Sequence, residues 1–343
     1  MIELETLRPA EDSAWDAFVR EGEGGLIYYS TRYRELLLDE LDCEAEYLIA
    51  REGGEIHGVL PLMWSENSGT WVLNSLPYYG SHGAPLAKSR EAEQALIEAW
   101  DERAADSRTL AATMVANPFR AGDPLEPRHD LTDARIGQVT RLPATEPDEL
   151  MALYSKNGRR NVRQAERRGV EVRSEPHRLH ELWRLHAENM RAIGGQAKSE
   201  EFFTRLPRHL DPGREYDLWV ARKEGKMIAG LLVSYFHDVA EYWTPTVDAD
   251  HRVDQPMAVT LYRAMSNAVR RGCRLWNWGG TWTSQGGVYR FKRKWGAEDR
   301  PYRYFIRIND RSVLDATPEE LLERFPHFYV VPFSALRSAA PAR

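Results

Sequence analysis

The sequence predicts an α/β protein built from two related halves. With 343 residues, the chain is longer than one ordinary domain and suits two domains of about 150–170 residues each. Residues 48–62 (LIAREGGEIHGVLPL) resemble residues 219–233 (WVARKEGKMIAGLLV), with matching Ala, Arg, Gly and Leu positions. In both halves this segment follows a helical region and precedes a strand, a helix and another strand. A duplicated α/β unit explains this shared order.

The local patterns place elements within each half. Each repeated segment reads as a β-hairpin, since two apolar strands flank a charged turn that contains glycine. Helical spacing of apolar residues predicts helices over 89–105, 177–193 and 256–271, and residues 109–115 read as a strand. Residues 120–138, rich in Pro, Asp and Gly, read as a loop near the domain junction. We therefore expect domains at 1–143 and 144–343.

Composition excludes several classes of protein. The net charge is -6, so the chain does not coat nucleic acid by bulk charge, and any anion contact must be local. The sequence holds no run of 18 or more apolar residues and no Cys/His ligand cluster, so we expect neither a membrane span nor a metal site. The acidic start and the two unpaired cysteines, Cys43 and Cys273, indicate a reducing, cytoplasmic location.

The most informative segment runs from residue 275 to 298 (LWNWGGTWTSQGGVYRFKRKWGAE). It reads as a buried strand, a glycine-rich break and a short basic helix. Glycines let a backbone approach a ligand closely, and large aromatic side chains provide flat walls. Together with the neighbouring cations they suit a polar, anionic substrate. The other interpretation is a buried strand end followed by an ordinary loop. The residues concerned are Trp276, Trp278, Trp282, Trp295, Gly279, Gly280, Gly286, Gly287, Arg290, Lys292, Arg293 and Lys294.

A second basic segment covers residues 155–173 (SKNGRRNVRQAERRGVEVR). Four of its cations share one face of a predicted helix, and two more flank them, with Glu166 as the offsetting charge. Arginine forks suit phosphate, so the segment indicates a local anion site. A solvated helix face is the alternative. The cations are Lys156, Arg159, Arg160, Arg163, Arg167 and Arg168.

Motifs of covalent catalysis are missing from the sequence. It contains no GxSxG, no Walker loop and no GxGxxG after a strand. An enzyme that passes an acyl group directly between two bound substrates needs no covalent residue. It needs positioning and a cation or N–H donors at the developing oxyanion.

Three stretches resemble the FemAB-type family of GNAT-like acyltransferases: RRNVRQAERRGVEV, YWTPTVDADHR, and WNWGGT followed by GGVYRFKRKWGAE. The first matches the family's Arg-Asn-(Ile/Val)-Arg motif at residues 160–163, and the last matches Gly-Gly-Thr at 279–281 and Tyr-x-Phe-Lys at 289–292. Residues 75–85 (SLPYYGSHGAP) extend the likeness into the first half. The resemblance implies two tandem GNAT-like domains with mixed, mostly antiparallel sheets flanked by helices. The members of this family that act on peptidoglycan transfer amino acids from aminoacyl-tRNA to an amine of a cell-wall precursor.

The resemblance also implies roles for individual residues. Lys292 is the expected catalytic residue, stabilising an oxyanion or positioning the donor carbonyl. Helical spacing separately places Val288, Phe291 and Trp295 toward the core, which leaves Lys292 free to point toward Gly279 and Gly280. The phosphate-binding residues are Arg159, Arg160 and Arg163, beside Asn161. Tyr242 and Trp243 are expected to line the acceptor channel. The remaining wall of the binding site is assigned to Gly279, Gly280, Thr281, Tyr289 and Arg290.

The chain departs from known patterns at specific places. Asn277 stands where the family often has Asp, and no heptad segment provides the coiled-coil arm of some tRNA-using members. Residues 247–262 (VDADHRVDQPMAVTLY) hold no glycine where CoA-binding GNAT enzymes have a phosphate loop, which disfavours CoA bound in the usual manner.

We therefore expect an N-acyltransferase with no resident cofactor, using aminoacyl-tRNA as co-substrate. Its acceptor would be a small-molecule or lipid-linked glycopeptide amine. One alternative is an acyl-CoA-dependent GNAT enzyme of exopolysaccharide or secondary-metabolite assembly. The other is a non-catalytic ligand-binding GNAT-like protein. The sequence leaves the oligomeric state open.

Overall fold

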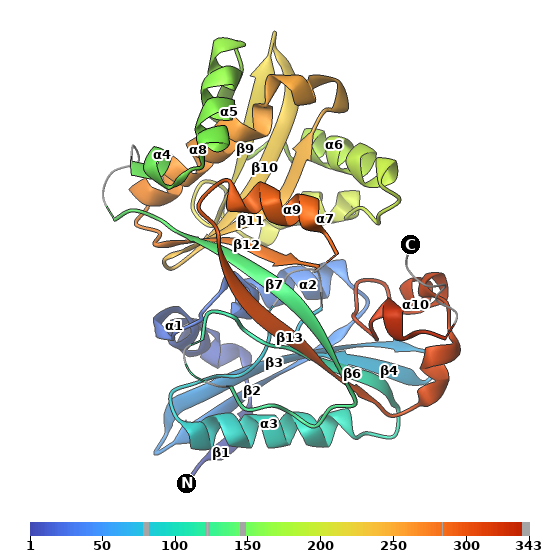
Figure 1. The fold of residues 1–343 in the computed structure, drawn as a ribbon. Coiled ribbons are helices and arrows are strands. Elements are labelled where there is room, and N and C mark those ends of the chain that lie inside the picture. Colours follow the sequence, from blue (N-terminus) through green and yellow to red (C-terminus); the bar gives the residue numbers. More distant parts are fainter. Residues whose placement is uncertain (78–81, 121, 123, 145–148, 283, 338–343) are drawn as a thin grey trace. The chain divides into compact units, whose positions relative to one another are not determined.

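The computed structural model describes residues 1–77, 82–120, 122, 124–144, 149–282 and 284–337 (Figure 1). It contains two compact units. The first comprises Met1–Arg135 together with Pro301–Arg343, and the second comprises Ile136–Arg300. The boundaries fall inside two strands, β7 (Leu131–Arg141) and β13 (Glu298–Ile308).

This division differs from the expected boundary at residue 143. Residues 301–343 belong with the first unit, because Tyr304–Ile308 of β13 pair with β6 (Thr109–Val115). The backbone of Tyr329 is also held in the first unit, since the Asn74 amide donates to its carbonyl and accepts from its N–H, both at 2.8 Å. The predicted loop over 120–138 ends early, because β7 begins at Leu131.

The first unit is a helix-covered mixed sheet. Its strand order is β1-β2-β3-β4-β6-β13, with β5 paired to β3, and the β4–β6 pair is parallel. α3 packs on β2, β3 and β6 through Leu96, Ala99 and Trp100, while α1 packs on β3 and α2 on β2. Its further elements are β1 (Glu3–Thr6), α1 (Asp12–Glu21), α2 (Thr31–Glu40), β2 (Glu44–Glu52), β3 (Glu55–Asn67), β4 (Thr70–Asn74), β5 (Leu86–Ala87), α3 (Arg90–Ala104) and α10 (Pro318–Arg324).

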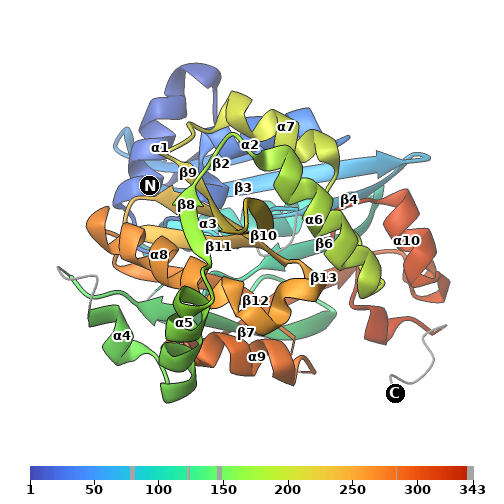
Figure 2. The ribbon, with the colours of Figure 1, turned by 90° about the horizontal axis from the view of Figure 1, so that it is seen from above.

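The second unit repeats this plan. Its strand order is β7-β12-β11-β10-β9-β8, with β11 and β12 parallel. In Figure 2, α8 lies on one side of β10 and β11, and α6 lies on the other side with α7. Its further elements are α4 (Leu150–Leu153), α5 (Lys156–Arg167), β8 (Glu171–Ser174), α6 (Leu179–Ala192), α7 (Glu200–His209), β9 (Tyr216–Lys223), β10 (Lys226–Phe236), β11 (Val239–Val247), α8 (Pro256–Arg270), β12 (Leu275–Thr281) and α9 (Gly286–Arg293).

The two hairpins pair in equivalent register, as the repeat predicts. Leu48 faces Leu60 and Ala50 faces Gly58 in the β2–β3 hairpin. At the corresponding positions Trp219 faces Leu231 and Ala221 faces Ala229 in the β9–β10 hairpin. In each turn the arginine, Arg51 or Arg222, donates to the carbonyl of the third residue along, Gly54 or Gly225, at 3.0 and 3.1 Å. The matching residues of the repeat therefore make matching contacts.

Most predicted helices form close to their expected bounds. Ser89 caps α3 by accepting the Ala92 N–H, and Thr317 and Glu320 form the reciprocal capping box of α10. The sequence interpretation did not include α7. The expectation that Val288 faces the core is wrong, because its side chain is exposed while Trp295 is buried. Along the described chain, none of the helices has the length and apolar content needed to cross a bilayer.

Candidate functional site: an opening between two parallel strands

The central feature of the second unit is a parallel strand pair that separates. β11 and β12 are in register over Val239–Glu241 and Leu275–Asn277, and the pairing stops there although both strands continue. Each strand carries an irregularity just beyond that point. On β11 the register against β10 skips Thr244, whose φ is 42°. On β12 the register against β7 shifts between Asn277 and Gly280, and Gly279 has a φ of 68°. Bulges bend strands, so these two keep β11 and β12 apart.

The corresponding strands of the first unit stay together. β4 and β6 pair from Trp71 with Thr109 to Asn74 with Thr113, and the Ser75 N–H donates to the Thr113 carbonyl at 2.9 Å beyond the end of β4. The Thr113 hydroxyl and the Asn74 amide both reach the Tyr329 carbonyl there. Within the described residues, separation of this central parallel pair is therefore a property of the second unit.

Lys292 lies against the β12 side of the opening. Its side chain is 4% exposed and its ammonium donates to the Thr281 hydroxyl at 2.7 Å, the Gly280 carbonyl at 3.1 Å and the Gly279 carbonyl at 3.3 Å. Burial lowers the pKa of Lys292 to about 8. The three N–H bonds of the ammonium each have an acceptor, so contact with a substrate oxygen requires exchange of one of them. The longest, to Gly279, is the natural one to exchange.

A buried acid and an amide stand where the two strands separate. The Asn277 side-chain amide donates to the Glu241 carboxylate at 2.9 Å, and its oxygen accepts from the Gly279 N–H at 2.9 Å. Both side chains are about 2% exposed. Asn277 thus links the last paired residue of β11 to the bend of β12. The sequence interpretation missed Glu241, although a carboxylate within the apolar stretch VAEYW is itself a signal, because such residues are rarely buried unpaired.

Aromatic side chains pack together on one face of the sheet, and the two residues predicted to line the acceptor channel, Tyr242 and Trp243, lie on opposite faces. Tyr242 packs against Trp278 with ring centroids 4.9 Å apart, and Trp278 packs edge-on against Phe291 of α9. Trp243 faces the other side of the sheet, where it meets Phe202 of α7 at 5.7 Å. Neighbouring residues of a strand point to opposite faces, which is why Tyr242 and Trp243 do not line one channel.

The first turn of the basic helix α5 lies beside the C-terminal end of α9. Gly158 permits this approach, because a Cβ there would come within 2.9 Å of the Lys294 carbonyl, and the Ser155 N–H donates to that same carbonyl at 2.9 Å. Arg159 is occupied by the carbonyls of Met151 and Tyr154, so it joins α5 to α4. Arg160 and Arg163 are exposed, as are Lys156 and Arg167 on the same stripe.

A pocket of about 350 Å³ opens between α5, α8 and α9. Asn161, Arg252, Gln255 and Lys294 supply polar groups, and Val247 from the end of β11 continues the wall toward the strand opening. The floor is apolar, with Pro256, Met257, Ala258, Phe291 and Trp295. Of these polar residues, sequence reasoning had singled out Asn161 and Lys294 but had missed Arg252 and Gln255.

The last two predicted residues lie on α9. The Tyr289 hydroxyl donates to the Asp299 carboxylate at 2.9 Å, and this hydrogen bond raises the pKa of Tyr289. Arg290 is exposed beside Gly286. Among the residues that the structure describes, no group of three or more His, Cys, Asp or Glu side chains is arranged to hold a metal ion.

Comparison with known proteins identifies this unit. Residues 152–293 match the acetyltransferase (GNAT) domain family. This segment is similar to a GNAT acyltransferase domain. The match spans α5, the β11–β12 opening and α9, while Lys294 and Trp295 of the pocket lie just beyond it. No curated protein gives a significant sequence match to the chain.

Solved structures extend the likeness to the whole fold. FemX is similar at 16% identity and a TM-score of 0.68, over 88% of this chain and 97% of FemX. The C-terminal domain of a putative lysylphosphatidylglycerol synthetase from Agrobacterium fabrum follows at 14% and 0.57, over 94% and 99%. A tandem GNAT protein from the clavulanic acid biosynthesis pathway gives 15% and 0.52, over 91% and 100%. The tandem GNAT fold and the FemAB-type resemblance are confirmed.

Proposed function

We propose that the GNAT domain transfers an aminoacyl group from aminoacyl-tRNA directly to an amine. The observation that carries this proposal is the continuity of the β11–β12 opening with a basic pocket and a basic helix. Val247 belongs to β11 and also lines the pocket, while Phe291 lines the pocket and packs against Trp278 of β12. A donor held by its phosphates in the pocket therefore reaches the opening with its acyl group.

The charge pattern favours a long anion over a compact one. Arg252 and Lys294 line the pocket, and the exposed cations of α5 extend from it as a stripe of Lys156, Arg160, Arg163 and Arg167. A row of exposed cations suits a nucleic-acid backbone, whose affinity arises from several phosphate contacts. A single pyrophosphate uses a compact site instead, and residues 248–256 carry none of the glycines that such a loop requires.

The chemistry needs positioning and charge stabilisation. The acceptor nitrogen attacks the carbonyl carbon of the aminoacyl ester, an N–C bond forms and the C–O bond to the ribose breaks. The proton lost by the amine goes to the departing ribose oxygen. Negative charge develops on the carbonyl oxygen during the attack, and an ammonium at that point lowers the barrier. Lys292, at the rim of the opening, supplies it by exchanging its contact with Gly279.

The acceptor is a cell-wall or glycan-linked amine in this proposal. Support for this acceptor comes from the FemAB-type resemblance and the likeness to FemX, while the lysylphosphatidylglycerol synthetase domain, named for an aminoacylated lipid, supports aminoacyl transfer in general. Transfer from acyl-CoA is the second candidate, since the structure of the clavulanic acid pathway protein is described with reference to acetyl-CoA.

Donor binding separates the two candidates. Purified protein is mixed with aminoacyl-tRNA, uncharged tRNA or acetyl-CoA, and the melting temperature and filter binding are measured. The proposal predicts stabilisation and retention of the RNA, and transfer of the amino acid to an amine acceptor. Stabilisation by acetyl-CoA alone, together with transfer of its acetyl group to the amine acceptor, would establish the CoA-dependent alternative. Binding of a donor without any transfer would instead support a non-catalytic module.

A further inference from the structure

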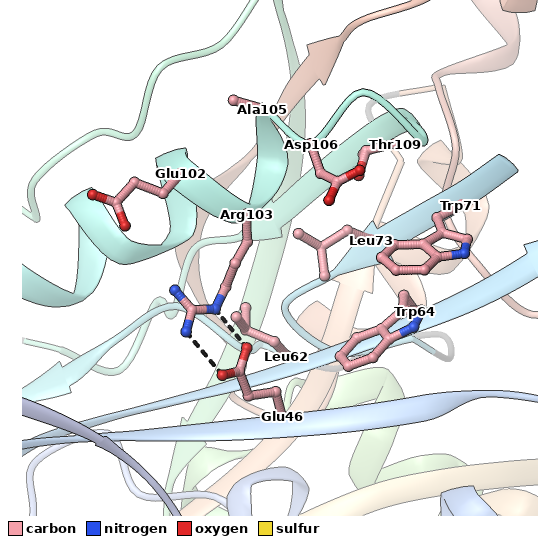
Figure 3. Close-up of a pocket in the computed structure, with 10 residues that line it drawn as sticks. All are labelled: Glu46, Leu62, Trp64, Trp71, Leu73, Glu102, Arg103, Ala105, Asp106 and Thr109. Carbon is pink, nitrogen blue, oxygen red and sulfur yellow. Dashed lines mark hydrogen bonds and ion pairs between the residues drawn. The ribbon is translucent and has the colours of Figure 1, made fainter.

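A second pocket lies in the first unit, formed entirely by its own residues. It has a volume of about 410 Å³, within the range of small-molecule sites. It opens near the end of α3, over strands β2, β3, β4 and β6 (Figure 3). The residues around it are Glu46, Leu62, Trp64, Trp71, Leu73, Glu102, Arg103, Ala105, Asp106 and Thr109.

One wall consists of two indoles. Trp64 and Trp71 come from the adjacent strands β3 and β4, and their rings are stacked with centroids 5.9 Å apart and planes 29° apart. Both side chains are half-buried, so part of each ring faces solvent. The Arg108 guanidinium covers Trp71 at 3.7 Å from the ring centroid, which fixes the outer indole in place. The wall is therefore aromatic and apolar, and part of it remains open to a ligand.

The facing wall consists of fixed polar groups. Arg103 donates twice to the Glu46 carboxylate, at 2.5 and 2.8 Å, and Glu46 also accepts from the Thr6 hydroxyl at 3.0 Å. Figure 3 shows this ion pair across the pocket from the indoles, with Leu62 and Leu73 between them. Asp106 is held by the side chain and N–H of Arg108. The carboxylates of Glu46 and Asp106 keep oxygen lone pairs that can accept hydrogen bonds from a ligand, and their ion pairs with arginine hold these oxygens in place.

The charge balance excludes the commonest charged ligands. Glu46 pairs with Arg103 and Asp106 pairs with Arg108, which leaves Glu102 as the excess charge among the carboxylates of the lining. A phosphate would be repelled by them. A cationic amine would find the carboxylates of Glu46 and Asp106 already paired with the guanidinium groups of Arg103 and Arg108. The remaining class is neutral, with an apolar face for the indoles and hydroxyls for the carboxylates.

We propose that this pocket binds a neutral sugar ring. The C–H face of a pyranose carries a slight positive potential and packs on the part of the Trp64 indole that faces solvent, while Trp71 supports Trp64 from the other side. Its vicinal hydroxyls donate to the carboxylates of Glu46 and Asp106 and accept from Arg103. The site is separate from the β11–β12 opening, so the proposal does not depend on the acyl donor. It gives the first unit a binding task, namely holding the saccharide part of a ligand.

Isothermal titration of the whole protein with neutral trisaccharides of glucose, galactose, mannose or N-acetylglucosamine tests the proposal. At least one trisaccharide should bind, and Trp71→Ala and Glu46→Gln should each weaken that binding by roughly tenfold or more. Trp183→Ala changes a half-buried tryptophan of the second unit and is the matched control, with unchanged binding expected. Trp64→Phe keeps an aromatic ring and should weaken binding less than Trp71→Ala.

The melting temperature of each variant shows whether it is folded. If Trp71→Ala unfolds the first unit, Glu46→Gln and Trp64→Phe carry the test. Failure of every sugar to bind would overturn the proposal. Sugar binding that all three pocket variants leave intact would overturn it too, as would saturable binding of inorganic phosphate or spermidine in place of sugars. A failure of aminoacyl transfer leaves these measurements unaffected, so the two proposals stand or fall separately.

Discussion

Asn277 donates a hydrogen bond to Glu241 at the last paired position of β11 and β12, with both side chains almost fully buried. The amide is matched to its two partners, because it gives a proton to a carboxylate and accepts one from the Gly279 N–H. An aspartate at position 277 would accept from Gly279 as well but would face a second carboxylate. The asparagine is therefore the residue that suits a chain carrying Glu241.

Asn277→Asp should destabilise the second unit. Two buried carboxylates in contact cannot both ionise without cost, so the pKa of one of them must rise. We expect a loss of roughly 2–4 kcal/mol in the free energy of unfolding at neutral pH, measured by urea denaturation. Lowering the pH should recover part of it. The double variant Asn277→Asp with Glu241→Gln restores one donor and one acid, and it should be more stable than the single variant. Equal stability of all three proteins would contradict this account.

Lys292 should give the protein a specific pH dependence of stability. Its pKa is about 8 in the folded protein and near 10.5 when exposed. Between these values the unfolded chain binds more protons, so stability rises with pH through that window and is constant below it. The free energy of unfolding of the wild type, minus that of Lys292→Met, should increase by on the order of 3 kcal/mol from about pH 8 to 10.5. A pH-independent difference would show that the ammonium is not held in a desolvated site.

The exposed arginines of α5 should affect binding and not folding. Arg160→Ala with Arg163→Ala should weaken tRNA binding by roughly 1–3 kcal/mol for each arginine–phosphate hydrogen bond that the substitutions remove. The slope of log affinity against log salt should fall by about one for each arginine replaced. Arg173→Ala, an exposed arginine on β8 paired with Glu171, is the control. Unchanged tRNA affinity together with a lower melting temperature would assign α5 a structural role.

The sequence was sufficient to predict the structural features that arise from residues close together in the chain. The repeat predicted the two hairpins, because the turn arginines and glycines make the same contacts in both units. The sequence was also sufficient to associate Lys292 with Gly279 and Gly280, because the helix that carries Lys292 begins only a few residues after these glycines. These features need only short-range order along the chain.

What the sequence did not predict depends on distant partners. No sequence pattern in residues 304–308 indicates that they pair with β6, and none indicates that Asn74 holds the backbone of Tyr329. The separation of Tyr242 from Trp243 follows from strand alternation once their position in β11 is known. The role of Glu241 could not be predicted either, because its partner Asn277 lies on another strand. Arg252 and Lys294 are far apart in the sequence, and only the folded structure shows that they line the same pocket.

The most direct test of the central claim is the kcat of Lys292→Met for amide formation from the donor that the wild type uses. If the ammonium stabilises the transition state at the β11–β12 opening, kcat should fall by roughly 10²–10³ while KM for the donor and the fold are retained. Lys226→Met, which changes an exposed lysine of the same unit that pairs with Asp248, should leave kcat unchanged. A kcat for Lys292→Met within about threefold of wild type, or a loss explained entirely by a lower melting temperature, would contradict the account.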